Sequence, residues 1–212
     1  MKGGEHARIN DGHPVAGVID TAPRRAQFSG SRDLLGDRGQ SGGAGYVCHT
    51  VNPRLFPEQL VFIINHAEDR WLLTDPMFVP LLEKLLPQIS GVKGFIVMSD
   101  DAHMPKTSLP NAISYEALIG DCSDAYDWPQ LDEREAVALC YTSGTTGDPK
   151  GVLYSHRSTV LHAFASIAPD GLGLSNRDTV LPVVPLFHVN AWGTPYSALM
   201  VGAKLVFPGP RH

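Results

Sequence analysis

The chain has 212 residues, of which 43% are hydrophobic and 18% are charged, and its formal net charge is −5 at pH 7. This length fits one large domain or part of one, and the negative net charge argues against a nucleic-acid partner bound through a basic surface. The cysteines Cys48, Cys122 and Cys140 form no C-x-x-C pair, so neither a zinc site nor a disulfide framework is indicated. No apolar run is long enough for a transmembrane segment, and the N-terminus lacks the apolar region of a secretory signal. We therefore expect a cytoplasmic protein.

Residues 1–45 differ from the rest of the sequence. They contain ten of the 21 glycines, scattered arginines and neither tyrosine nor tryptophan. Residues 36–45 are almost all glycine, serine and polar residues, which favours disorder over a packed element. Two interpretations stay open. The segment is either a flexible N-terminal tail or an out-of-frame translation joined to a genuine coding sequence near Gly43. Translation of the upstream DNA in the other two frames would separate them.

From residue 46 onward the sequence predicts alternating strands and helices. Strands are expected over residues 46–51, 71–74 and 94–98, and helices from Pro57 and over residues 79–86. The first helix has proline and Glu58 in its first turn, where an acidic side chain complements the helix dipole. Residues 94–98 (GFIVM) form a continuous apolar run, as expected of a parallel strand that is covered on both faces. This alternation implies βαβ units and a mostly parallel sheet.

The second half continues the alternation after a loop-like, acidic region at residues 99–135. A short helix is expected at residues 115–119. Strands are predicted at residues 135–141, 151–154 and 178–184. A helix is predicted at residues 156–168, with Ser155 as its N-cap. Residues 199–206 continue the α/β alternation. In the helix at 156–168, Val160, Leu161, Phe164 and Ile167 share one face.

The histidines do not predict a metal site. His49, His66 and His103 show no ligand spacing with one another, and His156 and His162 are six residues apart on different faces of their helix. We interpret His49, His66 and His103 as structural or exposed.

Residues 141–152, YTSGTTGDPKGV, are the stretch richest in chemical groups. Glycines allow the backbone to come close to a ligand, and successive N–H groups in such a loop bind anions, with hydroxyl groups as further donors. Lys150 supplies a flexible positive charge suited to phosphate. The order of residues differs from a Walker A loop, because Pro149 precedes the lysine and Gly151 follows it. Ser143 also lacks the glycine two positions earlier that a nucleophile elbow requires.

This loop resembles the phosphate-loop signature of the adenylate-forming superfamily, which includes acyl-CoA synthetases, luciferases and peptide-synthetase adenylation domains. Residues 185–193, PLFHVNAWG, resemble a second motif of the same superfamily. Over residues 46–212, about four fifths of the chain, the sequence is similar to fatty-acyl-CoA synthetases of the medium- and long-chain branch, which also includes methylthiopropionate–CoA ligases. The resemblance implies an α/β fold: an incomplete part of the N-terminal domain, with mostly parallel sheets flanked by helices. A peptide-synthetase domain is disfavoured because FHVNAW resembles the fatty-acid branch.

The resemblance also implies a two-step reaction with ATP, Mg²⁺ and CoA. A fatty acid or related carboxylate attacks the α-phosphate of ATP to give an acyl-adenylate and pyrophosphate, and the CoA thiol then displaces AMP. The expected partners are these small molecules, with no nucleic acid. A homodimer is an expected assembly of the full-length family.

The resemblance assigns roles to residues of both motifs. The nucleotide-binding residues it implies are Thr142, Ser143, Gly144, Thr145, Thr146, Gly147 and Lys150. Thr142 is in addition the expected Mg²⁺ contact, and Lys150 is expected to steady the loop or the leaving pyrophosphate. Lys150 and His188 are the expected catalytic residues, and the acyl/adenylate pocket is expected to be lined by His188, Val189, Asn190 and Trp192. Trp192 resembles the aromatic gate of the fatty-acid tunnel.

Other motifs of the family are not in this sequence. They are the adenine-binding Y-G-x-T-E segment, the ribose-binding aspartate, the hinge and the lysine of the C-terminal domain. Catalysis needs the whole set assembled in one geometry, so we expect a fragment that is inactive alone. The alternative is a truncated nucleotide- or acyl-binding module without catalysis.

Overall fold

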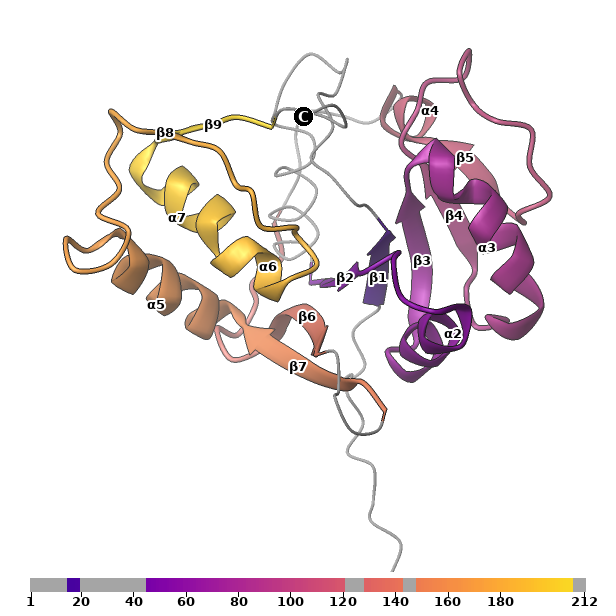
Figure 1. Cartoon of the computed structure of the whole chain (residues 1–212), viewed down its shortest axis with the longest axis horizontal. Helices are drawn as coiled ribbons and strands as arrows, with labels where there is room; N and C mark the ends of the chain where they lie inside the picture. The colour runs from indigo at the N-terminus through magenta and orange to yellow at the C-terminus, as the bar shows by residue number, and fades with distance from the viewer. Residues whose placement is uncertain (1–14, 20–44, 121–127, 143–147, 208–212) are drawn as a thin grey trace, which may run out of the picture.

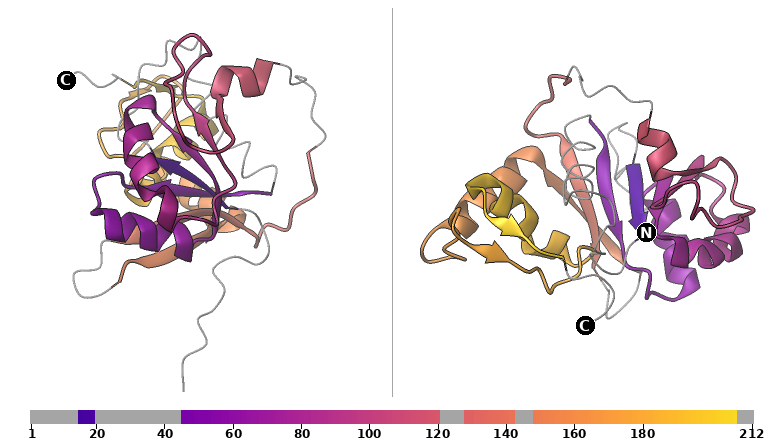
Figure 2. Two further views of the ribbon diagram at one scale, coloured as in Figure 1. Left: turned by 90° about the vertical axis from the view of Figure 1, so that its right-hand side faces the viewer. Right: turned by 90° about the horizontal axis from the view of Figure 1, so that it is seen from above.

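A computed structural model of the chain describes residues 15–19, 45–120, 128–142 and 148–207, with the backbone alone for residues 15–19. The main feature is a seven-stranded sheet with strand order β5-β4-β3-β1-β2-β6-β7 (Figures 1 and 2). Its strands are β1 (Val15–Ile19), β2 (Val47–Val51), β3 (Asp69–Thr74), β4 (Gly94–Val97), β5 (Ala112–Ser114), β6 (Ala136–Thr142) and β7 (Lys150–Ser155). Every neighbouring pair is parallel except β6–β7, which is antiparallel. The predicted α/β class with a mostly parallel sheet is confirmed.

The helix α2 (Pro57–His66) begins as the sequence predicts. Pro57 is its first residue, and the backbone N–H of Phe56 donates to Oε1 of Gln59 at 3.3 Å. This bond satisfies a donor at the helix start that has no partner within the helix. Leu60, Ile63 and Ile64 lie at helical spacing and are buried, so this face of α2 packs against the sheet.

The core forms where α2 and α3 (Val79–Leu85) pack against β2, β3 and β4. The short 3-10 helices η1 (Pro76–Phe78) and η2 (Leu86–Gln88) flank α3. The fully buried members of this cluster include Val51, Leu60, Leu72, Leu82, Ile89, Phe95 and Val97. Burial of each such side chain stabilises the fold by about 1.5–3 kcal/mol. This half of the molecule therefore holds the larger hydrophobic core and supports the site-bearing strands β2 and β6.

The second half contains α5 (His156–Ile167), β8 (Thr179–Val180), α6 (Val189–Trp192), α7 (Thr194–Val201) and β9 (Lys204–Leu205). β8 and β9 form a separate two-stranded parallel sheet. Figure 1 shows this half on the side of the molecule opposite α2 and α3, with β6 and β7 between them. As predicted, Ser155 caps α5, and its side chain accepts a hydrogen bond from the backbone N–H of Ser158 at 3.1 Å.

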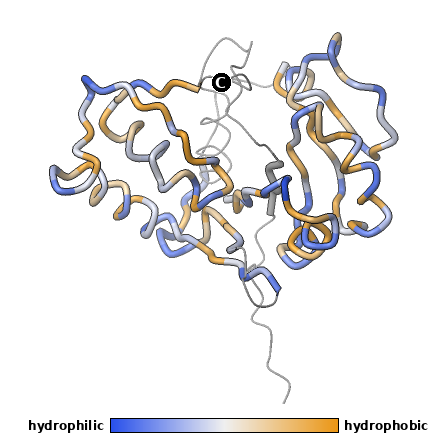
Figure 3. Tube along the Cα trace, in the orientation of Figure 1, coloured by the Kyte–Doolittle hydropathy of each residue, from blue (hydrophilic) through white to orange (hydrophobic). Residues whose placement is uncertain are grey.

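The apolar face predicted for α5 is largely exposed. Val160, Leu161 and Phe164 retain 47%, 55% and 58% of their accessible surface, whereas Ala163 is buried. The segment between β8 and α6 is also coloured as hydrophobic in Figure 3, and Val183 within it is 81% exposed. The helix packs against α7 through its small residues, and this leaves the larger side chains outside.

Three elements differ from the sequence prediction. Val15–Ile19 forms β1 between β2 and β3, although we expect no packed element before residue 45. The rest of residues 1–44 lies outside the described residues, so the two interpretations of their origin stay predictions. Ala112–Ser114 adds β5 within the expected loop region. The strand predicted at residues 178–184 has only the two residues Thr179–Val180, because Pro182 cannot donate to a strand ladder.

A short α4 (Tyr115–Gly120) follows β5, close to the position predicted for it. No helix in the described ranges is both long and apolar enough to cross a membrane.

Candidate functional site

The phosphate-loop motif lies between β6 and β7. β6 ends at Thr142, β7 begins at Lys150, and these two residues are partners in the antiparallel ladder. The Thr142 hydroxyl also donates to the backbone carbonyl of Lys150 at 3.4 Å. The predicted phosphate-binding residues 143–147 lie outside the described residues. The sheet therefore closes the base of the loop and holds Thr142 and Lys150 side by side at the carboxyl end of β6, where parallel sheets usually bind their ligands.

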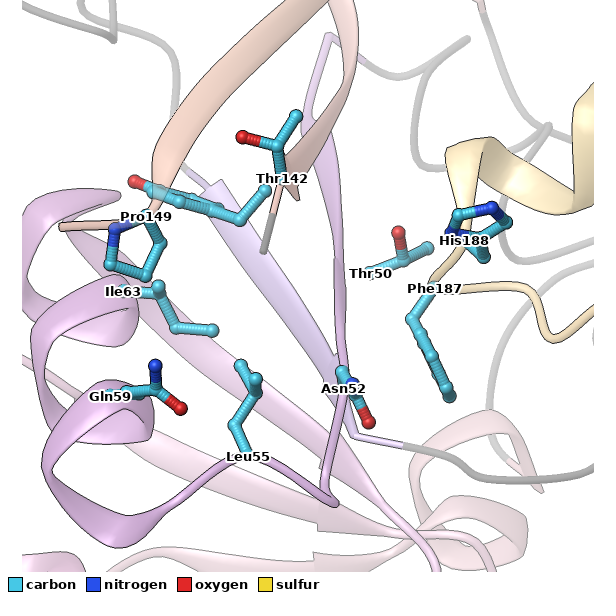
Figure 4. A pocket seen from close by; sticks show the side chains of 10 residues that line it. Thr50, Asn52, Leu55, Gln59, Ile63, Thr142, Pro149, Phe187 and His188 are labelled. Carbon is cyan, nitrogen blue, oxygen red and sulfur yellow. The ribbon is translucent and has the colours of Figure 1, made fainter. Parts of the chain in front are cut away.

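A cleft of about 80 Å³ opens beside this loop base. Figure 4 shows it between the α2 side of the sheet and the segment that carries Phe187 and His188. Its lining residues are Thr50, Asn52, Leu55, Gln59, Ile63, Tyr141, Thr142, Pro149, Phe187 and His188. Whole ligand pockets usually measure about 300–1,000 Å³. The cleft is thus the size of one group of a ligand, such as a phosphate.

The second motif forms a left-handed turn. Val189, Asn190, Ala191 and Trp192 all have positive φ, between 50° and 57°, and Gly193 follows at 68°. Residues other than glycine adopt this conformation at a cost of about 1–2 kcal/mol each. Such strain persists only where the surrounding structure imposes it, and it is concentrated at functional sites.

The structure brings together only some of the predicted site residues. Thr142 and His188 line the same cleft, whereas Lys150, Val189, Asn190 and Trp192 are not among its lining residues. Lys150 is exposed, and Trp192 retains 57% of its surface. The roles given to these residues remain predictions.

Tyr141, directly before the loop, is held by a network of polar groups. Its hydroxyl lies 2.7 Å from Nδ1 of His66 at the end of α2, and its ring centroid is 5.1 Å from that of His49. His49 Nδ1 in turn lies 2.9 Å from the carboxylate of Asp69. His49 and Asp69 are fully buried, and β1 lies between their strands. The network therefore ties the loop base to α2 and across β1 to β3.

Burial, together with the negative charge of Asp69, raises the pKa of Tyr141 far above its usual value of 10. Desolvation by burial also raises the pKa of Asp69, against the lowering effect of His49. Both shifts reflect the cost of placing a negative charge in this part of the sheet.

The Tyr141 shift predicts a loss of stability in alkali. The unfolded chain releases the phenol proton near pH 10, whereas the folded chain keeps it to higher pH, so the unfolded state gains from ionisation above pH 10. We expect the urea midpoint to fall as pH rises above 10, and to fall less steeply in Tyr141→Phe. Urea titrations at pH 8 to 11 measure this. Equal slopes for the two proteins would contradict the prediction.

The described residues contain no group of three or more histidine, cysteine or acidic side chains that could hold a metal ion. The Thr142 hydroxyl is a hard oxygen donor beside the cleft and fits as one ligand of Mg²⁺. That ion commonly takes few protein ligands and completes its shell with phosphate oxygens and water.

A family model described as "AMP-binding enzyme" matches residues 43–212. The chain belongs to this family of AMP-binding enzymes. A medium-chain-fatty-acid–CoA ligase from Ectopseudomonas oleovorans is 60% identical over 168 residues, which cover 79% of this chain and 31% of the relative. A 3-methylmercaptopropionyl-CoA ligase from Ruegeria lacuscaerulensis is 56% identical over the same shares of both chains. These findings confirm the family predicted from the two motifs.

The fold of this AMP-binding family member is shared by solved structures. A long-chain-fatty-acid–CoA ligase from Archaeoglobus fulgidus superimposes with a TM-score of 0.76 at 22% identity, over 94% of this chain and 36% of that one. The chain spans about a third of the length of the curated relatives and solved structures that it matches.

Sequence reasoning missed the polar residues that lie at the end of β2. Thr50 and Asn52 line the cleft because β2 lies next to β6, with Thr50 opposite Cys140. The order of strands in the sheet is not visible in local periodicity. The turn at Asn52-Pro53, directly after a predicted strand, was the one signal available, because ligands of parallel sheets bind beyond such strand ends.

Proposed function

We propose that this chain supplies the phosphate-loop half of an ATP-dependent acid–thiol ligase that acts on fatty acids or related carboxylates. The observation that carries the proposal is the meeting of the two family motifs. Thr142 ends β6 and leads into the loop, and His188 belongs to the second motif. These two residues are 46 positions apart in the sequence, and both line one cleft. The relatives named as fatty-acid and methylmercaptopropionate ligases support this substrate class.

The first step of the proposed reaction brings a carboxylate together with a polyphosphate. Mutual repulsion of these anions is the main obstacle, so positive charges and N–H dipoles that face the phosphates contribute most. Lys150 lies at the mouth of the loop, opposite Thr142. Its ammonium group supplies a charge for the β- and γ-phosphates or the departing pyrophosphate, and the Thr142 hydroxyl supplies an oxygen. Bound Mg²⁺ would neutralise phosphate charge at this position.

His188 serves the other side of the cleft in this proposal. It is the residue before α6, its side chain is exposed, and its imidazole faces the same cleft as Thr142 (Figure 4). An imidazole there can donate a hydrogen bond to the carboxylate or to the adenylate formed from it. Trp192 and Val189 follow on the left-handed turn as apolar side chains for the acyl chain, and both are exposed.

The competing function is a module that binds nucleotide or acyl groups without catalysis. Isothermal titration of the 212-residue chain with ATP·Mg²⁺ separates the two. Dissociation constants in the micromolar range would favour the module. Binding too weak to measure would indicate that the phosphate-loop half needs the remainder of the domain that the relatives have.

We expect no measurable ligase activity from the 212-residue chain alone. It spans 31% of the length of its relatives, and catalysis needs all of the reacting groups held in one geometry. A coupled assay for AMP release with a fatty acid, ATP and CoA measures this. AMP release above the rate of a Lys150→Met variant would overturn the expectation.

A further inference from the structure

The left-handed turn at residues 189–193 needs something to hold it. Four consecutive residues other than glycine share this conformation, and α6 has no side-chain cap at its start. Asparagine tolerates a positive φ better than most residues, but Val189, Ala191 and Trp192 do not. Contacts outside the turn must therefore select it.

The side chain of Asn190 makes those contacts. Its Oδ1 accepts from the Cys140 thiol at 3.3 Å and from the Thr50 hydroxyl at 3.4 Å. The two donors also lie 3.3 Å from each other. Cys140 on β6 and Thr50 on β2 are paired in the parallel ladder, and both are buried. Two neighbouring strands thus present donors at one level of the sheet to a single acceptor on the turn.

The far end of the turn packs closely against α5. A Cβ atom placed on Gly193 would lie 2.8 Å from Nδ1 of His162 on α5. Gly193 also needs its positive φ of 68°. The turn therefore lies between the sheet, which Asn190 contacts, and α5, which Gly193 approaches closely. His188, which lines the cleft, is two positions before Asn190, and the exposed Trp192 is two positions after it.

We propose that Thr50, Cys140 and Asn190 form a positioning cluster that holds the turn in its left-handed conformation. The Asn190 side chain faces the sheet, and its amide oxygen accepts hydrogen bonds from Thr50 and Cys140. Asn190 therefore positions the other residues of the turn. The conformational part of this proposal stands without any ligand. Only the inference that the cluster positions His188 for contact with substrate rests on the proposed function.

Trp192 provides a local readout. In the 212-residue chain labelled with 5-fluorotryptophan, fluorine NMR gives signals from Trp71, Trp128 and Trp192, and a Trp192→Phe variant assigns the third. We expect Thr50→Val and Cys140→Ala each to shift and broaden the Trp192 signal. Thr50→Ser and Cys140→Ser keep a hydrogen-bond donor, so the Trp192 signal should stay close to its wild-type position and width in these variants. An unchanged signal from Trp71 on β3 shows that the sheet is intact, and Trp128 reports on the segment before β6.

Limited proteolysis gives the size of the effect. We expect Asn190→Ala, which removes the shared acceptor, to raise chymotrypsin cleavage after Phe187 or Trp192 about tenfold, equivalent to about 1.4 kcal/mol. In a chain that already carries Asn190→Ala, adding Thr50→Val or Cys140→Ala should not raise cleavage further, because the hydrogen bonds to Asn190 are already lost.

Asn190→Gly is the matched control, since glycine adopts positive φ freely but has no amide. The proposal requires Asn190→Gly to behave like Asn190→Ala. It is overturned if Asn190→Gly matches the wild type, or if Thr50→Val and Cys140→Ala leave the Trp192 signal unchanged. If these conformational effects are seen, but Lys150→Met leaves the ATP·Mg²⁺ affinity of a chain extended to the length of the relatives unchanged, the proposed function is contradicted and the positioning cluster stays in place.

Discussion

Replacement of Asp69 by alanine is expected to lower the free energy of unfolding by about 3–5 kcal/mol. The Asp69 carboxylate lies 2.9 Å from Nδ1 of His49, and both side chains are fully buried. Within the part of the chain that the structure describes, Nε2 of His49 has no hydrogen-bond partner. Without Asp69, the histidine would lose the partner of its other nitrogen as well. Domains are commonly stable by only about 5–15 kcal/mol, so the loss would be a large fraction of the total.

Urea unfolding followed by circular dichroism measures this difference. The chain offers a matched control in Asp100, whose carboxylate lies 2.7 Å from Nδ1 of His103, but with side chains 45% and 81% exposed. Exposed ion pairs contribute little to stability, so Asp100→Ala should unfold at nearly the wild-type urea concentration. Equal losses in the two variants would mean that burial does not decide the strength of the His49–Asp69 pair.

The second large effect concerns nucleotide binding. Under the proposed function, Lys150→Met should weaken the binding of ATP·Mg²⁺ by about ten- to a hundredfold, because it removes a charge-assisted contact to phosphate. Lys150 starts β7 opposite Thr142 and is exposed, so the substitution should leave the fold intact.

Titration calorimetry of the wild type and the variant gives the ratio of dissociation constants. Where the chain alone binds too weakly, the same substitution is compared in a chain extended to the length of the relatives. Lys204→Met on β9 is the control, since Lys204 is also exposed and belongs to the separate two-stranded sheet. An equal loss of affinity in both variants would indicate a general charge effect and refute a specific role for Lys150.

Local patterns predicted those parts of the fold that local interactions determine. The spacing of Leu60, Ile63 and Ile64 predicted α2, the cap at Ser155 predicted the start of α5, and the apolar run at residues 94–98 predicted a parallel strand. β1 (VAGVI) was missed because it lies within residues 1–45, whose glycine-rich composition favours disorder. Its pairing also depends on strands that come later in the chain, since Val15 pairs with Val47, 32 positions further on.

The site shows the same limit. The two motifs directed attention to Thr142 and His188, which the fold does bring to one cleft. Thr50 comes to this cleft only because β2 and β6 are neighbours, with Thr50 paired to Cys140 ninety positions later. The exposed face of α5 has a related cause: helical spacing shows which side chains share a face, but not whether anything covers it.

The central position of β1 has a consequence for how the protein is made. During synthesis β1 leaves the ribosome before any of its partners exist, and it must wait for both β2 and β3. It lies outside the family match at residues 43–212, yet it joins β5-β4-β3 to β2-β6-β7. Trimming the gene to the matched region would therefore cut the sheet between the strand of His49 and the strand of Asp69. Expression experiments on this protein should keep the strand Val15–Ile19.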